Sequence, residues 1–241
     1  MRYSTVYERL FSQESKPGIL ILIDPDRVNR NTVEALVHKI NEHDGVKAIL
    51  VGTSILLSDD FDDFVSRVRK VSRFPVIIFP GNSLQVSKNA DAFLLPSLIS
   101  GRNPDFLIGE HVKIAVFLKN SGIEVIPTGY MLVESGNYTS VEYISFTRPI
   151  PREKIDIAIA HAVAGELLGL KLLYLEAGSG AKYPVPPEMI RSVVDSVSIP
   201  VVVGGGLRTR KDVGNAINSG ASHVVIGTAF EEDPEILREV L

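Results

Sequence analysis

The sequence of 241 residues contains no cysteine and no tryptophan. The lack of cysteine excludes disulfide frameworks, thiolate metal sites and cysteine nucleophiles. No apolar run approaches the roughly 18 residues of a membrane span, and Met1–Ser4 has no signal-peptide core. The formal net charge of −4 provides no basic field for nucleic acid. We therefore expect a cytoplasmic protein that binds no nucleic acid.

Short runs rich in Val, Ile and Leu recur along the chain, with amphipathic segments between most of them. Most of these runs are apolar throughout, which is typical of parallel strands covered on both faces. About 250 residues is the usual size of an α/β barrel. We predict one (β/α)₈ (TIM) barrel domain over residues 1–241. The runs are Gly18–Asp24, Lys47–Gly52, Phe74–Phe79, Asp91–Leu95, Gly122–Thr128, Lys171–Glu176, Ile199–Gly204 and Ser222–Gly227.

Two connections between these runs depart from the barrel pattern. Only eleven residues separate Phe79 from Asp91, which predicts a shortened or missing third helix. The connection Gly129–Pro151 is long for a compact domain, and such loops are usually functional lids or disordered. Elsewhere, helix starts are predicted at Asn31 with Glu34 as a capping box, at Pro186-Pro187 and at Thr209.

Glycines gather where the last strands end. Without a Cβ, backbone amides can approach an anion closely, and TIM barrels often hold phosphate after strands 7 and 8. Gly204–Gly206 and Gly227-Thr228 stand at those two positions. A run of three glycines alone is explained as well by a tight turn. Paired with Gly-Thr at the adjacent strand end, it favours a phosphate site.

Carboxylates also follow strands. Glu176 ends an apolar strand ahead of a glycine-rich turn, which favours binding the hydroxyls of a small polyol phosphate over a structural salt bridge. Asp24 and Asp26 flank Pro25, and their oxygens suit Mg²⁺ carried with a diphosphate, with Ser54 or Thr53 nearby. Turn or cap chemistry is the simpler interpretation for Asp26, so Asp24 is the better metal candidate.

Three other features are assigned structural roles. Asp59–Asp63 fits a diphosphate-binding DDxxD pattern, but acidic residues suit a helix start, and all-helical DDxxD proteins lack strands. The five histidines show no metal-ligand spacing. Ile155–Leu170 is apolar nearly all round, which favours a homo-oligomer.

The strand-end motifs together resemble the geranylgeranylglyceryl phosphate synthase family, which includes heptaprenylglyceryl phosphate synthases. The resemblance covers essentially the whole chain, and the string Tyr174–Gly180 is its most specific part. The matching segments are Leu22–Asp26, Val51–Ser54, Phe79–Asn82, Tyr174–Ala181, Val203–Arg208 and Gly227-Thr228.

The resemblance implies an Mg²⁺-dependent prenyltransferase that joins geranylgeranyl diphosphate to the 3-hydroxyl of sn-glycerol 1-phosphate and releases diphosphate. It implies that Asp24 and Ser54 hold Mg²⁺, and that Glu176 positions the hydroxyl or acts as a base. It also implies that the missing third helix leaves space for a prenyl chain. The residues implied to hold glycerol 1-phosphate are Tyr174, Leu175, Glu176, Ala177, Gly178, Ser179, Gly180, Gly205, Gly206, Gly227 and Thr228.

One position departs from some members of the family, which have lysine where this chain has Ile23. The isoleucine resembles the archaeal branch of the family that lacks this lysine. Without it, either Lys182 or Arg208 is the candidate cation that assists the leaving group. A lipid donor also implies transient, peripheral membrane contact. Tyrosines of the long loop and its surroundings are predicted to line or cover the prenyl groove; they are Tyr130, Tyr138, Tyr143 and Tyr183.

Two other functions stay open at this point. Another phosphate-handling barrel enzyme would need its own acid–base pair, for which no second carboxylate or histidine is evident. A non-catalytic phosphate sensor would bind ligand without Mg²⁺-dependent turnover. Within the family, a donor longer than geranylgeranyl diphosphate is the alternative, as in a heptaprenylglyceryl phosphate synthase.

Overall fold

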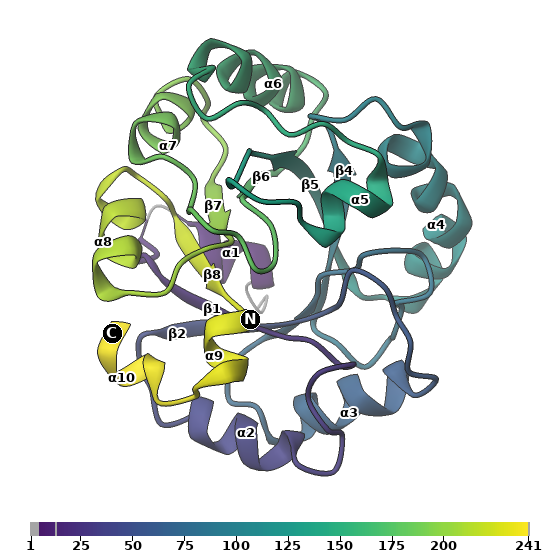
Figure 1. Cartoon of the computed structure of the whole chain (residues 1–241). Helices are drawn as coiled ribbons and strands as arrows, with labels where there is room; N and C mark the ends of the chain where they lie inside the picture. Colours follow the sequence, from purple (N-terminus) through teal and green to yellow (C-terminus); the bar gives the residue numbers. More distant parts are fainter. Residues whose placement is uncertain (1–4, 13, 241) are drawn as a thin grey trace.

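The computed structural model describes residues 5–12 and 14–240. Its eight strands are parallel and close into a barrel in sequence order, which confirms the predicted TIM barrel (Figure 1). Residues 1–4, 13 and 241 of the predicted single domain lie outside the described part. The strands are β1 (Gly18–Ile23), β2 (Val46–Val51), β3 (Val76–Ile78), β4 (Ala92–Leu98), β5 (Glu124–Leu132), β6 (Leu172–Glu176), β7 (Val201–Gly204) and β8 (His223–Ile226).

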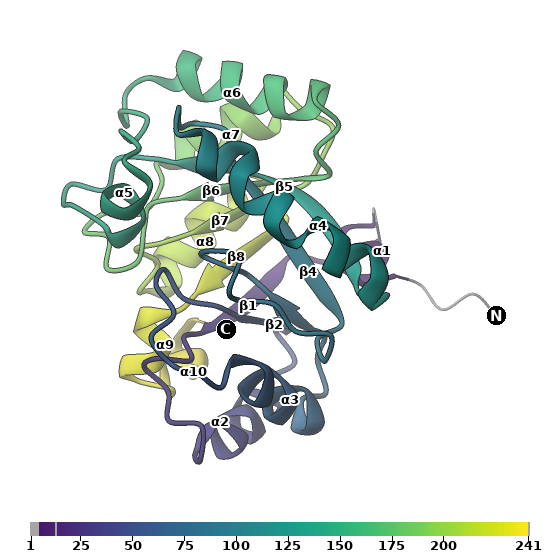
Figure 2. The same ribbon diagram turned by 90° about the vertical axis from the view of Figure 1, so that its right-hand side faces the viewer.

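Helices surround the barrel, and α1 lies at the end where the strands begin (Figure 2). None of the described helices has both the length and the apolarity needed to cross a membrane. The helices are α1 (Val6–Phe11), α2 (Val33–Ile40), α3 (Phe61–Val71), the π-helix η1 (Asp105–Gly109), α4 (Glu110–Ser121), α5 (Ser140–Ser145), α6 (Ile155–Leu167), α7 (Pro187–Val194), α8 (Arg210–Asn218), α9 (Thr228–Glu232) and α10 (Ile236–Val240).

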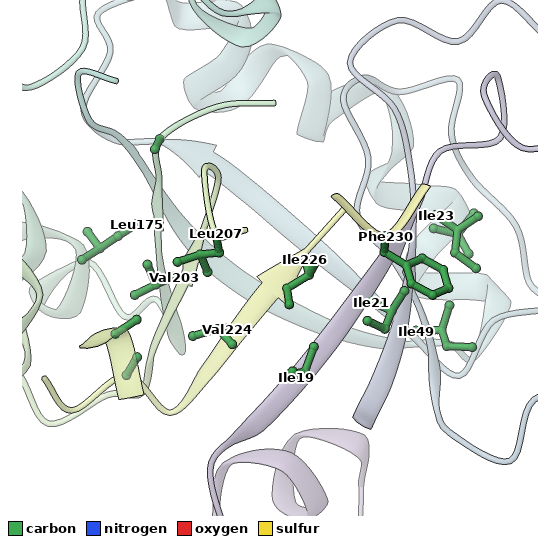
Figure 3. Close-up of a cluster of buried hydrophobic side chains, with 14 of the residues drawn as sticks. Ile19, Ile21, Ile23, Ile49, Leu175, Val203, Leu207, Val224, Ile226 and Phe230 are labelled. Carbon is green, nitrogen blue, oxygen red and sulfur yellow. The ribbon is translucent and has the colours of Figure 1, made fainter. Parts of the chain in front are cut away.

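The strands divide their side chains between two apolar layers, because successive residues point to opposite faces. Side chains such as Leu50, Ile77 and Val202 fill the barrel interior together with Val6 and Leu10 of α1. The alternate set packs between strands and helices, where Figure 3 shows Ile21, Ile23 and Leu175 among others. Only the residues of the inward-pointing set can therefore place their side chains at the barrel mouth.

No helix lies between β3 and β4, as predicted, and a hydrogen-bonded loop takes its place. The buried Gln85 accepts from the Thr53 amide at 2.9 Å and donates to the Thr53 carbonyl at 2.7 Å. A Cβ on Gly81 would lie 2.2 Å from the Thr53 carbonyl oxygen, so only glycine allows this approach. The loop is thereby fixed against the end of β2.

Two predicted strand ends and one predicted helix start are wrong. β4 continues to Leu98 and β5 to Leu132, because Leu98 pairs with Tyr130 and Leu132 pairs with Glu176. The long connection therefore begins only after Leu132. The helix predicted to start with a capping box at Asn31 is α2, which begins at Val33 after Thr32, and Thr32 makes no side-chain cap bond.

Other helix starts are confirmed. Pro187 opens α7, and Thr209 forms a reciprocal capping box with Asp212 at α8. Asp62 and Asp63 lie in the first turn of α3, with Asp63 paired to Arg67 at 2.7 Å. The acidic run is thus a helix start and lies outside the cavity described below.

His223 holds α1 against the barrel. Its Nδ1 accepts from the Gly18 amide at 3.2 Å, and its Nε2 donates to the Leu10 carbonyl at 2.8 Å. Burial lowers the pKa of His223, which keeps the ring neutral in this role.

We expect His223→Ala to lower the free energy of unfolding by about 2–4 kcal/mol, since two buried backbone groups lose their partner. Urea unfolding measures the effect. His38 is exposed on α2, so His38→Ala is the control and should change stability by less than about 0.5 kcal/mol. Equal effects of the two substitutions would contradict the anchoring role of His223.

Candidate functional site

One cavity opens at the C-terminal ends of the strands, where the sequence predicts the site. Its polar wall comes from the ends of β1, β2, β6, β7 and β8, and its apolar wall from β3, β4, α4 and α5. The polar wall includes Asp24, Ser54, Glu176, Gly178, Ser179, Gly180, Gly205, Gly206, Arg208, Gly227, Thr228 and Glu231.

The turns after β6 and β7 have backbone conformations that favour glycine. Gly178, Gly205 and Gly206 have φ angles of 100°, 81° and 71°. A Cβ on Gly205 would lie 2.4 Å from Glu176 Oε1 and 2.6 Å from the Gly178 amide nitrogen. The two turns therefore pack backbone to backbone.

Hydroxyls connect these turns to α9. Ser179 Oγ and Thr228 Oγ1 lie 3.2 Å apart, and Gly227 and Thr228 begin α9 directly after β8. Side-chain hydroxyls and backbone amides thus surround one corner of the cavity, a donor set that suits a phosphate group. We call Gly178–Gly180, Gly205-Gly206 and Gly227-Thr228 the glycine cup.

Glu176 lies beside the glycine cup at the top of the barrel interior. Its side chain is buried, and Oε1 accepts from the Gly178 amide at 2.5 Å. Burial raises the pKa of Glu176 to about 7, although the Gly178 bond favours the ionised form. The carboxylate can therefore take up or hold a proton near neutral pH.

Tyr174, one layer below, belongs to an aromatic stack. Its ring lies 4.8 Å from that of Phe79 and 5.5 Å from that of Tyr130. Burial, and secondarily the charge of Glu176, raises the pKa of Tyr174 well above its ordinary range. Its hydroxyl has no hydrogen-bond partner among the described residues, which leaves a buried donor below the cavity.

A second acidic group lies across the mouth. Glu231 Oε1 accepts from the Asp24 amide at 2.9 Å, and Arg27 approaches both carboxylates, at 3.8 Å from Asp24 and 3.4 Å from Glu231. Burial raises the pKa of Asp24 and of Glu231, and their mutual repulsion adds to the rise for Glu231. Two carboxylates held this way suit a cation.

Glu231 was not among the predicted site residues. It stands three residues after Thr228, so on the single turn of α9 both side chains share a face. The three-residue spacing between Thr228 and Glu231 is the feature of the sequence that indicates a position of Glu231 near the site. The Asp26 carboxylate has a structural role, although not within its own turn: it accepts from the amides of Leu57 at 2.9 Å and Ser58 at 2.8 Å, in the connection after β2.

The apolar wall occupies the space next to the missing third helix. It continues from Phe79 and Tyr130 toward the helices on that side of the barrel. Its aliphatic and aromatic residues are Phe93, Leu95, Leu98, Phe106, Ile114, Val141 and Ile144. The cavity therefore joins a polar cup to an apolar groove.

Several predicted residues lie outside the cavity. Leu175 and Ala177 point outward between Tyr174, Glu176 and Gly178, and both are buried in the outer apolar layer (Figure 3 shows Leu175). Their side chains cannot contact a ligand in the cup.

Only one of the four tyrosines predicted for the prenyl groove lines the cavity. Tyr130 lines the cavity, whereas Tyr138, Tyr143 and Tyr183 do not. Tyr138 and Tyr143 are exposed to solvent and do not line the groove, so of the expectation that they line or cover it, the first part is wrong and the second stays a prediction. Val141 and Ile144, on the opposite side of α5 from Tyr143, take that place.

Of the two candidate cations, Arg208 lines the cavity. Lys182 is outside it, with Nζ 5.0 Å from the centre of the Tyr183 ring. The structure therefore favours Arg208 as the cation that faces a bound anion.

The sequence pattern of the PcrB family matches residues 12–241. The chain belongs to the PcrB family. A Flavobacterium johnsoniae protein named geranylgeranylglyceryl phosphate synthase is 50% identical over 233 residues, 95% of each chain. A Spirosoma linguale protein of the same name is 44% identical over 232 residues, covering 96% of this chain and 93% of its own.

A solved structure of this family shares the whole fold. It is (S)-3-O-geranylgeranylglyceryl phosphate synthase from Thermoplasma acidophilum, in complex with its substrate sn-glycerol-1-phosphate. The TM-score is 0.92 at 30% identity, and the alignment covers 99% of this chain and 96% of the other. The resemblance predicted from the strand-end motifs is confirmed.

Proposed function

We propose that this PcrB-family member is a prenyltransferase that transfers the geranylgeranyl group of geranylgeranyl diphosphate to sn-glycerol 1-phosphate. The observation that carries the proposal is the cavity itself, which joins a glycine cup, a buried carboxylate and an apolar groove at one barrel mouth. A phosphorylated polyol matches the first two parts, and a prenyl chain matches the third. The names of the relatives support these two substrates.

The acceptor phosphate is proposed to lie in the glycine cup, where the Ser179 and Thr228 hydroxyls and the backbone amides provide donors. Its glyceryl hydroxyls then point toward Glu176. The oxygen of the 3-hydroxyl attacks C1 of the donor, the bond from C1 to the diphosphate oxygen breaks, and diphosphate leaves with the electron pair. Glu176 accepts the hydroxyl proton, which its pKa of about 7 permits.

Mg²⁺ is proposed to be held by Asp24 and Glu231, with Ser54 as a further oxygen donor on the same wall. Among the described residues no group of three or more His, Cys, Asp or Glu forms a metal cage. A carboxylate pair nevertheless fits, since Mg²⁺ commonly takes one or two carboxylates and completes its shell with water and substrate phosphates. When bound, the ion would neutralise the charge that develops on the leaving diphosphate.

The prenyl chain is proposed to pass Phe79 and Tyr130 into the apolar groove. A cytoplasmic location and a homo-oligomeric assembly remain predictions.

The test is a transfer assay with sn-glycerol 1-phosphate, Mg²⁺ and radiolabelled prenyl diphosphates of several lengths. We expect prenylated glycerol phosphate, with geranylgeranyl diphosphate as the best donor. A preference for heptaprenyl diphosphate would correct the donor and leave the chemistry intact. Absence of product with every donor, or a preference for sn-glycerol 3-phosphate, would overturn the proposal.

We expect Asp24→Asn to raise the Mg²⁺ concentration for half-maximal turnover by at least about tenfold, because one of two carboxylates is lost. Magnesium titrations of turnover measure this. Asp59 lies outside the cavity, so Asp59→Asn is the control and should keep the wild-type profile. An unchanged profile in Asp24→Asn would remove Asp24 from the metal site.

A further inference from the structure

Large apolar side chains are exposed around the cavity mouth. They come from the connections that follow β2, β3 and β5, so all belong to the end of the barrel where the strands finish. α5, which carries one of them, stands out at the end of the molecule opposite α1 (Figure 2). We call this set the apolar rim: Ile55, Leu57, Leu84, Tyr138, Tyr143 and Phe146.

Phe146 is held outward at an energetic cost. It follows α5 with φ 51° and ψ 35°, and it is the one non-glycine residue with positive φ in the described chain. A bulky side chain rarely adopts this left-handed conformation, and such strain concentrates at functional positions. The Phe146 amide donates to the Glu142 carbonyl, which fixes the turn, and the side chain is 85% exposed.

α5 has apolar residues on both sides. Val141 and Ile144 face the cavity, and Tyr143 on the other side is 77% exposed. Ser140 and Glu142 are the polar residues of α5 that reach water, and the other half of this short surface helix is apolar apart from the buried Ser145. The exposed side of α5 is thus separated from the apolar groove by one helix only.

The rim carries cations that suit an anionic surface on the side of α5, whereas Asp59 and Asp60 follow Leu57 in the connection after β2. Arg148 follows Phe146 by two residues and is exposed, and the exposed Lys182 lies over Tyr183. Aromatic rings combined with cations are typical of surfaces that sit in the headgroup layer of a bilayer.

We propose that the apolar rim docks on a lipid bilayer and places the groove against it, so that prenyl chains move between membrane and cavity without crossing water. This inference rests on the proposed function, in which the donor and the product both carry a prenyl chain. The surface that meets the membrane is the apolar rim, and its principal contacts with the bilayer are Phe146 and Tyr143.

The test is co-sedimentation without substrate, using phosphatidylcholine vesicles with and without phosphatidylglycerol. We expect the wild type to bind, more strongly when phosphatidylglycerol is present. Tyr143→Ser/Phe146→Asn should lower the partition coefficient at least about tenfold, since two apolar contacts are lost and asparagine tolerates the left-handed turn. The control is Leu167→Ser/Leu168→Ser, because these residues are 82% and 77% exposed but lie where α6 leads into the start of β6.

Wild type that binds neither vesicle, or equal losses in both double variants, would overturn the proposal. So would a rim variant that changes the oligomeric state in size-exclusion chromatography and leaves vesicle binding intact, since the rim would then cover a second copy. Turnover with soluble geranyl diphosphate should be unchanged in the rim variant. Absence of turnover with any donor would contradict the proposed function. The vesicle experiment contains no substrate, so it tests membrane binding by the rim independently of that function.

Discussion

Glu176→Gln is expected to lower kcat by about 10²–10⁴-fold, the usual contribution of a positioned general base. Glutamine keeps the shape of the side chain and can still accept from the Gly178 amide, but it cannot take up the hydroxyl proton. Because the pKa of Glu176 is about 7, wild-type turnover should rise with pH through that region. Steady-state kinetics against pH measure both effects, and a variant that retains wild-type kcat would show that Glu176 is not the base.

The same substitution should stabilise the protein at alkaline pH. Burial raises the pKa of Glu176 from 4.5 to about 7, so the folded state holds the proton more tightly than the unfolded state. The favourable contribution is complete below about pH 4.5 and is lost as the pH rises through about 7. Glutamine mimics the protonated form at every pH, and the variant should therefore gain about 2–3 kcal/mol over the wild type at pH 8.

Urea unfolding of both proteins at pH 5 and pH 8 measures this difference. Equal stability at both values would show that burial does not raise the pKa of Glu176. The combination of lower turnover and higher stability at pH 8 would identify a carboxylate whose burial serves the reaction.

Gly205→Ala is expected to raise KM for sn-glycerol 1-phosphate by about a hundredfold or more. The new Cβ would lie 2.4 Å from Glu176 Oε1 and 2.6 Å from the Gly178 amide nitrogen, so the two turns of the glycine cup must separate. Losing one or two charge-assisted hydrogen bonds to the phosphate, each worth about 1.5–3 kcal/mol, accounts for this magnitude.

The matched control for backbone strain is Gly122→Ala. Gly122 ends α4 with φ 75°, close to the 81° of Gly205, and a Cβ there meets nothing within 4 Å. Both variants therefore incur the cost of a left-handed alanine, whereas only Gly205→Ala disturbs the cup. Equal changes in KM would attribute the effect to strain, and the cup assignment would fail.

The sequence was sufficient to predict the barrel and the glycine cup because both depend on short-range signals. Apolar runs define the strands, and parallel strands place Glu176, Gly205 and Thr228 at one end of the barrel whatever the details of packing. The family predicted from these strand ends is confirmed.

Predictions failed where contacts distant in the chain decide the outcome. The extension of β5 to Leu132 depends on pairing with β6, and no local pattern indicates it. Leu175 belongs to a specific motif but points away from the cup because of strand parity. The long loop and an aromatic residue type predict that Tyr143 lines or covers the groove, and only the orientation of α5 shows that Val141 lines the cavity instead.

The most direct test of the central claim is a crystal structure with sn-glycerol 1-phosphate and an unreactive thio-diphosphate analogue of the donor. We predict the acceptor phosphate between Ser179, Gly206 and Thr228, the donor diphosphate beside Asp24 and Glu231, and the prenyl chain along Phe79 and Tyr130. An acceptor phosphate bound beside Asp24, or a prenyl chain outside the groove next to the missing third helix, would contradict the account.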